Sequence, residues 1–88
     1  MKTPVFANQF KKDYKLSEKR GKDLRLLKLI ITELVNENSL PASNKDHNLT
    51  RNYKNCRECH IMSDWLLIYE IIEDEIQFLR TGTHSDLF

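Results

Sequence analysis

The sequence predicts an α+β fold, in which a helical hairpin covers one face of a small, mainly antiparallel sheet of four strands. Apolar residues recur every three or four positions in the first half of the chain, which is typical of helices, and change to strand-like runs from Tyr53 onwards. The chain has 88 residues with only two glycines and two prolines, which suits one domain with tight connections. We therefore expect residues 1–88 to form a single domain with the order strand, helix, helix, strand, strand, strand.

The first half of the chain is predicted to hold a short strand followed by two helices. Residues 3–7 are apolar enough for the strand, and Pro4 either confines it to a sheet edge or moves its start to a later residue, because proline has no N–H to donate. Three aromatic residues at spacings of four then share one helical face: Phe6, Phe10 and Tyr14. Gly21 ends this pattern, and a second, amphipathic helix is expected from Asp23 to Asn36. Its apolar stripe consists of Leu24, Leu27, Ile31 and Leu34, with Ile30 and Val35 beside it.

The second half is predicted to hold three strands in a meander, after a polar connection from Asn36 to Asn48. The strands are expected at Arg57 to Met62, Trp65 to Ile72 and Glu75 to Thr81, with turns at Ser63-Asp64 and Glu73-Asp74 between them. The middle strand is apolar on both faces, as expected of a central strand. The two helices are then expected to cover one face of the sheet.

Charge is distributed unevenly along the chain, although its net value is +1. Residues 1–44 carry nine Lys/Arg and five Asp/Glu, a net charge of +4, whereas residues 45–88 carry five and eight, a net charge of −3. Eight of the basic residues lie between Lys11 and Lys28. Such a block attracts a polyanion, and the alternative is a solvated helix face.

No segment of the sequence indicates a membrane span or export. A transmembrane helix needs about 20 apolar residues, and the longest apolar runs here are only a few residues long. The N-terminal residues also lack the apolar region of a secretory signal. We expect a cytoplasmic protein, in which Cys56 and Cys59 stay reduced.

The segment from Cys56 to His60 has the C-x-x-C-H spacing of covalent haem attachment. Haem attachment of this kind belongs to exported proteins, however, and in a strand the side chains of Cys56 and Cys59 point to opposite faces. A zinc site needs a second pair of ligands, and a redox motif needs its cysteines at a helix start. We therefore expect no cofactor and no metal, with one cysteine in the core and the other half-exposed.

All three histidines lie in the second half of the chain, together with acidic and basic residues. The set consists of His47, His60 and His84 with Arg57, Glu58, Asp64 and Arg80. Histidine takes and gives protons near neutral pH, arginine stabilises the charge of a phosphoryl group, and an aromatic ring such as that of Phe88 stacks on a base. These groups suit metal-free cleavage of RNA, and the alternative is that the histidines are incidental surface residues.

Several segments resemble the YafQ-type toxins of the RelE/ParE superfamily. They read KDHNL from Lys45, YK from Tyr53, RECHI from Arg57, DWLLIY from Asp64 and RTGTHSDLF from Arg80. The resemblance is strongest over residues 45–88 and most specific in the last nine residues. It implies a toxin of a type II toxin–antitoxin pair, with a small sheet and a helical hairpin. Such a toxin is an mRNA interferase, which cuts mRNA in the ribosomal A site without metal, leaves a 2′,3′-cyclic phosphate and a 5′-OH, and so inhibits translation.

The resemblance also implies roles for individual residues. His84 and Asp64 match the acid–base positions of the family, His60 and His47 match its supporting or alternative acid–base histidines, and Arg80 matches the arginine that binds the scissile phosphate. The structural alternatives are that His47 bonds the backbone of its loop, that His60 is a half-buried strand residue, that Asp64 caps a turn, and that Arg80 pairs with Glu58.

Four further residues are expected to bind the substrate. Phe88 matches the terminal aromatic that holds the substrate base, with coverage of the core edge as the alternative. Lys54, Arg57 and Glu58 lie in the resembling segments, and Glu58 is expected to orient an arginine or a histidine. Trp65 is expected to serve mainly in packing.

The chain departs from its relatives in the segment that follows Leu49. Arg51 stands where relatives often have glycine, and Tyr53 replaces the usual tryptophan. Asn55, which follows, tolerates the backbone conformations of glycine better than most residues do. These differences affect the expected geometry of the turn rather than the chemistry.

The resemblance implies two kinds of partner. One is the ribosome with its mRNA, for which the basic stretch from Lys11 to Lys28 would supply most of the contact. The other is a cognate antitoxin, expected to have a DNA-binding dimer domain and a segment that folds on the toxin. The chain has no helix-turn-helix pattern, so we expect no direct DNA binding except through the antitoxin complex. The alternative function is an RNA- or protein-binding module of the same fold without nuclease activity.

Overall fold

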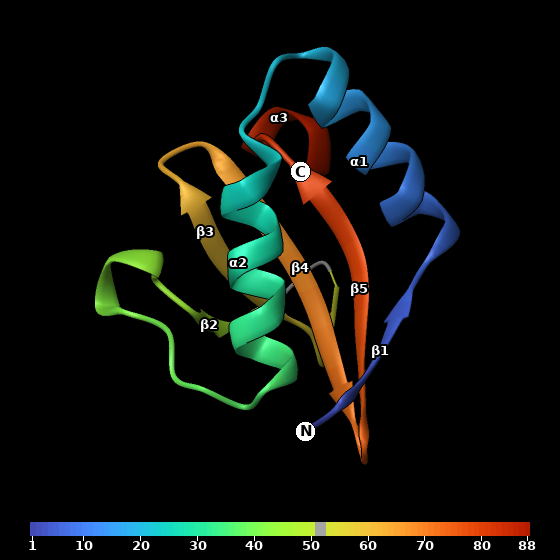
Figure 1. The fold of residues 1–88 in the computed structure, drawn as a ribbon, viewed down its shortest axis with the longest axis vertical. Helices are drawn as coiled ribbons and strands as arrows, with labels where there is room; N and C mark the ends of the chain where they lie inside the picture. Colours follow the sequence, from blue (N-terminus) through green and yellow to red (C-terminus); the bar gives the residue numbers. More distant parts are fainter. Residues whose placement is uncertain (51–52) are drawn as a thin grey trace.

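A computed structural model describes residues 1–50 and 53–88, and it confirms the predicted α+β class (Figure 1). The elements are β1 (Thr3–Phe6), α1 (Asn8–Lys19), α2 (Leu24–Val35), the 3₁₀ turn η1 (Ala42–Asn44), β2 (His47–Asn48), β3 (Arg57–Met62), β4 (Trp65–Ile72), β5 (Glu75–Gly82) and α3 (His84–Leu87). Within the described ranges, no helix has the length and apolar character needed to span a membrane.

The strands form one five-stranded sheet in the order β1-β5-β4-β3-β2. β1 runs parallel to β5, and the other neighbours are antiparallel. The prediction of four strands was therefore wrong, because it missed β2, which lies in the segment expected to be a polar connection. A strand of two residues is too short to show a period in the sequence. The predicted edge position of the strand that contains Pro4 is confirmed.

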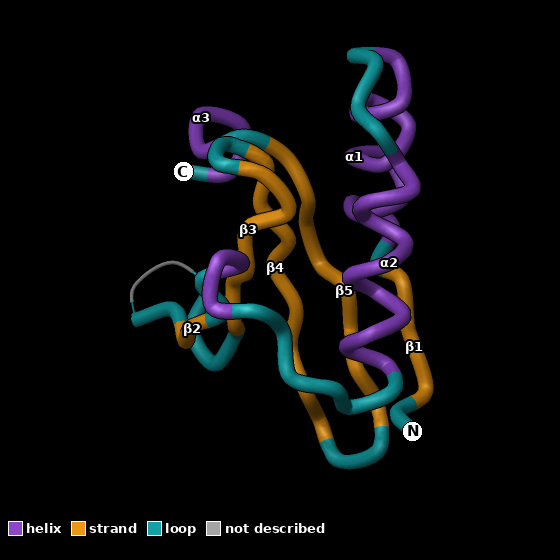
Figure 2. The backbone as a smooth tube through the Cα atoms, turned by 60° about the vertical axis from the view of Figure 1, so that its left-hand side comes forward, coloured by secondary structure: helices purple, strands orange, loops and turns teal. Residues whose placement is uncertain are grey.

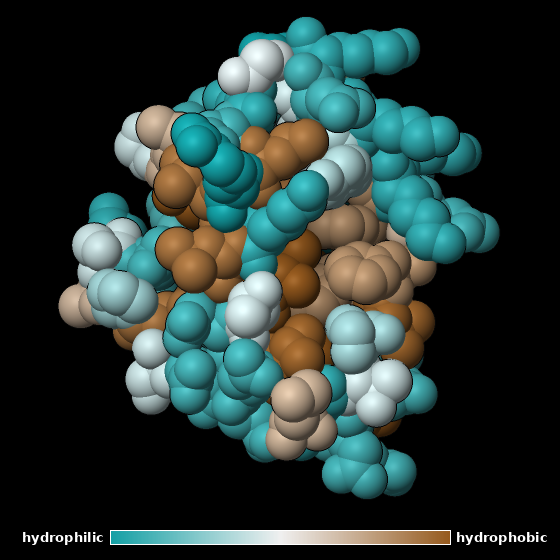
Figure 3. Space-filling view, in the orientation of Figure 1, coloured by the Kyte–Doolittle hydropathy of each residue, from teal (hydrophilic) through white to brown (hydrophobic). Residues whose placement is uncertain are grey.

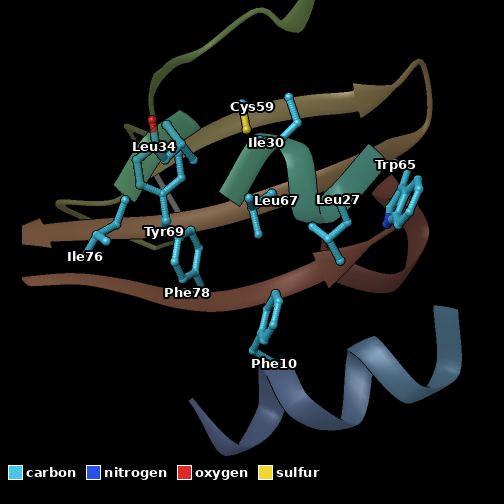
Figure 4. Close-up of a cluster of buried hydrophobic side chains, with 10 residues drawn as sticks. All are labelled: Phe10, Leu27, Ile30, Leu34, Cys59, Trp65, Leu67, Tyr69, Ile76 and Phe78. Carbon is cyan, nitrogen blue, oxygen red and sulfur yellow. The ribbon is translucent and has the colours of Figure 1, made fainter. Parts of the chain in front are cut away.

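The helical hairpin covers one face of the sheet, as predicted (Figure 2). Gly21, with a φ of +78°, lies in the turn between α1 and α2, and the Asp23 side chain accepts the backbone N–H of Arg25 at 3.1 Å where α2 begins. Ten buried residues fill the space between the hairpin and the sheet (Figure 4): Phe10, Leu27, Ile30, Leu34, Cys59, Trp65, Leu67, Tyr69, Ile76 and Phe78. Ile30 of α2 belongs to this core, whereas Ile31 of the predicted stripe is only partly buried.

A smaller apolar cluster lies on the opposite face of the sheet and consists of Cys56, Leu66, Ile68 and Leu87. Leu87 comes from α3, which covers part of this face. The hydroxyl of Thr83 accepts the N–H of Asp86, and the Asp86 carboxylate accepts the N–H of Thr83, which together form a capping box. α3 was not predicted, because a single helical turn has no repeating apolar pattern.

The two cysteines belong to different clusters, so the prediction that they point to opposite faces is confirmed. Both are buried, with exposed fractions of 4% for Cys56 and 0% for Cys59. The expectation of one half-exposed cysteine was therefore wrong. The cluster that contains Leu87 of α3 buries Cys56, and this helix was not foreseen.

Candidate active site

The sheet face opposite the helical hairpin holds most of the predicted site residues. Residues paired across neighbouring strands point to the same face. His47 pairs with Glu58, Glu58 with Ile68, and Ile68 with Arg80, which forms one row across β2, β3, β4 and β5. His60 pairs with Leu66 in the adjacent row. The register of the sheet therefore brings His47, Glu58, His60 and Arg80 to one surface.

Glu58 lies between two of the histidines. Its Oε1 is 3.6 Å from Nε2 of His47 and 3.5 Å from Nε2 of His60, and Glu58 itself is buried. His47 Nδ1 lies 2.6 Å from the carbonyl oxygen of Lys45, and this nitrogen donates because a carbonyl only accepts. Glu58 thus lies where it can orient a histidine, as expected. His47 also makes the backbone hydrogen bond that was considered as its structural alternative.

His84 and Asp64 form the most tightly bonded pair of the site. His84 Nδ1 lies 2.6 Å from Asp64 Oδ1, and the backbone N–H of His84 donates to the same oxygen at 2.9 Å. These two bonds lower the pKa of the Asp64 carboxyl, so it is ionised at neutral pH and holds a proton on Nδ1. Asp64 comes from the β3–β4 turn and His84 is the first residue of α3. The ring centroids of His84 and His60 are 5.7 Å apart, and those of His60 and His47 are 6.5 Å apart.

Arg80 is held by a buried carboxylate from α1 rather than by Glu58. Its Nε lies 2.7 Å from Oδ2 of Asp13 and its Nη2 lies 3.3 Å from Oδ1, which is a bidentate ion pair. Its Nη1 donates to the hydroxyl of Tyr53 at 3.2 Å. Since a guanidinium has five N–H groups, two of them are not used by these contacts. Within the described residues, Arg80 pairs with Asp13 and not with Glu58, which was the structural alternative.

Phe88 lies at the rim of this surface. Its ring packs edge-on against the ring of Tyr53, with centroids 5.7 Å apart and an interplanar angle of 89°. The Tyr53 hydroxyl also donates to the backbone carbonyl of Leu87 at 3.2 Å. The Phe88 ring remains 53% exposed, which is enough for one face to contact a ligand.

Arg57 is separated from the other predicted site residues. It pairs with Tyr69 on the helix-covered face of the sheet, and its guanidinium contacts the Tyr69 hydroxyl, Asp46 and the Asn48 side chain at 3.3, 3.3 and 2.8 Å. Neighbouring residues of a strand point to opposite faces, so the alternation already indicated that Arg57 and Glu58 cannot share one surface. Lys54 is exposed in the loop before β3.

The expected glycine-like backbone at Asn55 is present, with a φ of +69°. Arg51, which was expected to stand in place of a glycine, lies outside the described residues.

Trp65 is fully buried and its Nε1 donates to Thr81 Oγ1 at 3.0 Å, in agreement with a packing role.

Asp13 supports the site, although it was not among the predicted site residues. Asp13 is buried on α1 and accepts hydrogen bonds from Arg80, from the backbone N–H of Thr81 and from Gln9. The spacing contained a signal, since Asp13 stands three residues after Phe10 and four before Ser17, and all three face inward. A charged residue on the buried face of a helix indicates a polar partner in the interior.

Within residues 1–50 and 53–88, no group of three or more His, Cys, Asp or Glu side chains is arranged to hold a metal ion. The site brings together a histidine–aspartate pair, two histidines that share a glutamate, and an arginine with a fixed orientation. Groups of this kind transfer protons and stabilise negative charge.

Comparison with known proteins decides the family. Residues 2–88 match the family described as the bacterial toxin of the type II toxin–antitoxin system, YafQ. The chain belongs to the YafQ family of toxins. This confirms the resemblance on which the sequence analysis relied.

Individual relatives are similar over nearly the whole chain. The mRNA interferase toxin YafQ of Escherichia coli strain B / BL21-DE3 is 45% identical over 84 residues, which cover 94% of this chain and 91% of the relative. The crystal structure of the E. coli DinJ–YafQ complex has 43% identity and a TM-score of 0.93, and covers 100% of this chain and 99% of that one. A metal-bound toxin from Helicobacter pylori has 40% identity and a TM-score of 0.93 over 100% of both chains. The predicted enzyme class, an mRNA interferase and hence an endoribonuclease, is confirmed through these YafQ relatives.

Proposed function

We propose that this chain cleaves mRNA in the ribosomal A site by acid–base catalysis. A base takes the proton of the 2′-OH, the 2′-oxygen attacks the phosphorus, and the 5′-oxygen leaves with a proton from an acid. The products are a 2′,3′-cyclic phosphate and a 5′-OH. The observation that carries this proposal is the 2.6 Å pair of His84 and Asp64 beside His60.

The proton transfers are assigned to the three histidines. Asp64 holds the proton of His84 on Nδ1, which leaves Nε2 as the nitrogen that exchanges a proton with the substrate. His60 and His47 supply the second proton-transfer group, and the carboxylate of Glu58 stabilises whichever of the two is protonated. His84 can act as the base and the pair of His60 and His47 as the acid, or the reverse, and the overall reaction is the same.

Arg80 and Phe88 are assigned to substrate binding. The ion pair with Asp13 fixes the guanidinium of Arg80, and its remaining N–H groups can contact the phosphoryl oxygens as negative charge develops there. The exposed ring of Phe88 offers a surface on which a base can stack.

The test is cleavage of mRNA by the purified protein, with and without ribosomes and with and without EDTA, mapped by primer extension. We expect cuts only with ribosomes, and we expect them to survive EDTA. The EDTA arm matters because the Helicobacter pylori relative is a metal-bound toxin. Cuts that disappear in EDTA would contradict the metal-free mechanism, and cuts in free RNA would contradict strict dependence on ribosomes.

His84→Ala is the decisive variant, and Ser85→Ala is its matched control on the next, exposed position of α3. We expect His84→Ala to lose cleavage and growth arrest while it stays folded, and Ser85→Ala to keep both. Toxicity that survives His84→Ala would overturn the mechanism. No cleavage by the folded wild-type protein would favour the binding-module alternative.

The proposed contact with the ribosome uses the basic stretch from Lys11 to Lys28. The lysines of α1 are exposed, and hydrophilic side chains gather over this helix on the face shown in Figure 3. Contacts with phosphate groups release counterions, so binding weakens steeply as salt is raised. We expect affinity for ribosomes to fall with salt concentration, and we expect a Lys11→Gln/Lys15→Gln variant to bind more weakly with a shallower salt dependence. A salt-independent affinity would contradict this contact.

We also propose a cognate antitoxin as the protein partner. The E. coli relative was crystallised with the antitoxin DinJ, and the likeness of the two folds supports a similar partner here. Any DNA binding is assigned to the antitoxin, so a gel shift with this chain alone should be weak and sensitive to salt. A tight, sequence-specific shift by the chain alone would contradict that assignment.

A further inference from the structure

The helix that carries His84 is too short to hold its own position. α3 has four residues, and an isolated helix of this length is not stable in water. Its orientation must therefore come from contacts with the rest of the protein. One of these contacts involves Asp86, a residue without a role in the predicted site.

Asp86 receives hydrogen bonds from two directions. Arg20, which ends α1, donates from Nη1 to Oδ2 of Asp86 at 2.6 Å and from Nη2 to Oδ1 at 3.3 Å. The backbone N–H of Thr83 donates to Oδ2 at 2.9 Å. Arg20 and Asp86 are 66 residues apart in the sequence, so this ion pair ties the end of the helical hairpin to the C-terminal turn.

The Asp86 side chain also packs against the backbone of Gly82. A Cβ atom placed on Gly82 would lie 3.0 Å from Cβ and from Oδ2 of Asp86, so a side chain at this position would press against Asp86. Asp86 thus holds Thr83 by a hydrogen bond and contacts Gly82, the two residues that precede His84. The backbone N–H of His84 in turn donates to Asp64.

We propose that Arg20 and Asp86 form a positioning pair, which fixes α3 so that His84 meets Asp64 and faces the reacting phosphate. This inference rests on the proposed nuclease function. Arg20 acts through Asp86, whose carboxylate accepts from both Nη1 and Nη2 of its guanidinium. Removal of Arg20 then slows the chemical step, and it weakens the binding of ribosomes only as much as the loss of another positive charge from the stretch Lys11 to Lys28 does.

The test compares Arg20→Ala with Arg25→Ala, which removes the same charge from an exposed arginine of α2. Arg25 pairs with Asp23 in its own turn and has no contact with α3. Cleavage is measured against ribosome concentration. We expect the maximal rate of Arg20→Ala to fall at least tenfold, with a half-saturating ribosome concentration within twofold of that of Arg25→Ala. Arg25→Ala loses the same charge from the proposed ribosome contact, so its weaker binding should change the half-saturating concentration and leave the maximal rate within twofold of wild type.

Three further measurements separate positioning from general structural damage. In a double-mutant cycle, Arg20→Ala combined with Asp86→Asn should be no slower than Asp86→Asn alone, because Arg20 acts only through Asp86. Arg20→Lys, which keeps one charged donor, should recover part of the lost rate. Hydrogen exchange of the Thr83 amide should speed up at least tenfold in Arg20→Ala and stay unchanged in Arg25→Ala.

Three outcomes would overturn the inference: an unchanged maximal rate in Arg20→Ala, rate losses that multiply in the double variant, or an effect confined to the half-saturating concentration. The last result would assign Arg20 to RNA contact instead. If the wild-type protein does not cleave RNA at all, the proposed function fails. The exchange of the Thr83 amide then decides alone whether the pair fixes α3.

Discussion

At the scale of single residues, three carboxylates of the site differ in what surrounds them. Asp64 is exposed and accepts two hydrogen bonds from His84. Glu58 is buried between two imidazoles, and Asp13 is buried against Arg80. Their environments therefore assign them different tasks: to hold a proton on His84, to stabilise a charged histidine, and to orient an arginine.

Acid should destabilise the protein through Asp64 and Asp86. The pKa of Asp64 is lowered first by the backbone N–H of His84, and the pKa of Asp86 first by the side chain of Arg20. A lowered folded-state pKa stabilises the fold fully above the unfolded value of about 3.9, and this stabilisation is lost as the pH falls toward the folded value. We expect the melting temperature to fall below about pH 4, and to fall less steeply in Asp86→Asn. Circular dichroism melts between pH 7 and pH 2 measure this, and equal slopes in the two proteins would contradict it.

Neither cysteine should react in the folded protein. Burial raises the pKa of Cys59 to about 12, and it also raises the pKa of Cys56. The thiolate is the reactive form, so we expect no reaction with Ellman's reagent at pH 8 within minutes, and two thiols after denaturation in guanidinium. Rapid native labelling of either thiol would show that its side of the sheet opens readily.

At the scale of elements, α1 supports the site although none of its residues belongs to the histidine cluster. Asp13 of α1 and Arg20, the residue that follows its last turn, lie seven positions apart, about two helical turns, and so point to the same side. Asp13 holds Arg80 of β5 and Arg20 holds Asp86 of α3. The helical hairpin therefore covers the core and also orients two groups on the far side of the sheet.

Asp13→Asn should be strongly destabilising. It removes the charge that compensates Arg80 in a largely buried place, and the loss of one partner from a buried pair costs about 3 kcal/mol. Glu18→Gln, at an exposed position of α1, is the matched control and should change the free energy of unfolding by less than about 0.5 kcal/mol. Urea denaturation measures both. Similar small changes in the two variants would show that Arg80 finds another partner.

Gly82→Ala should move α3. The added methyl group would lie 3.0 Å from the side chain of Asp86, and overpacking of this kind destabilises a fold by about 1–3 kcal/mol. We expect a lower melting temperature and at least a tenfold loss of cleavage. An active Gly82→Ala protein of unchanged stability would show that α3 adjusts without harm to the site.

At the scale of the whole molecule, the two ends of the chain lie at different places relative to the site (Figure 1). The amino group of Met1 contacts Glu37, just after α2, at 2.9 Å, whereas Phe88 lies beside Tyr53 at the edge of the site. The described chain thus has one end next to the proposed chemistry and one end away from it.

A tag fused after Phe88 should therefore impair the toxin more than a tag fused before Met1. We expect at least a tenfold loss of cleavage for the C-terminal fusion and less than a twofold change for the N-terminal fusion. Ribosome-dependent cleavage by the two purified fusions measures the difference. Equal activities would show that Phe88 and its surroundings are not part of the substrate-binding surface.

The sequence by itself determined the α+β class, both long helices, the three C-terminal strands and the opposite faces of the two cysteines. These features depend on local periods and turn residues, which a short stretch of chain carries by itself. The motifs also pointed to the histidines and to Asp64. Sequence alternation within β3 was enough to place Arg57 and Glu58 on different faces, although the sequence analysis treated them together.

Only the tertiary structure decided which groups support the site. The pairing of Arg80 with Asp13 joins residues 67 positions apart, and that of Arg20 with Asp86 joins residues 66 positions apart. The short strand β2, the parallel pairing of β1 with β5 and the single turn of α3 likewise depend on neighbours that are distant in sequence. Contacts of this kind leave no period in the sequence, because they are set by how the helical hairpin and the sheet pack together.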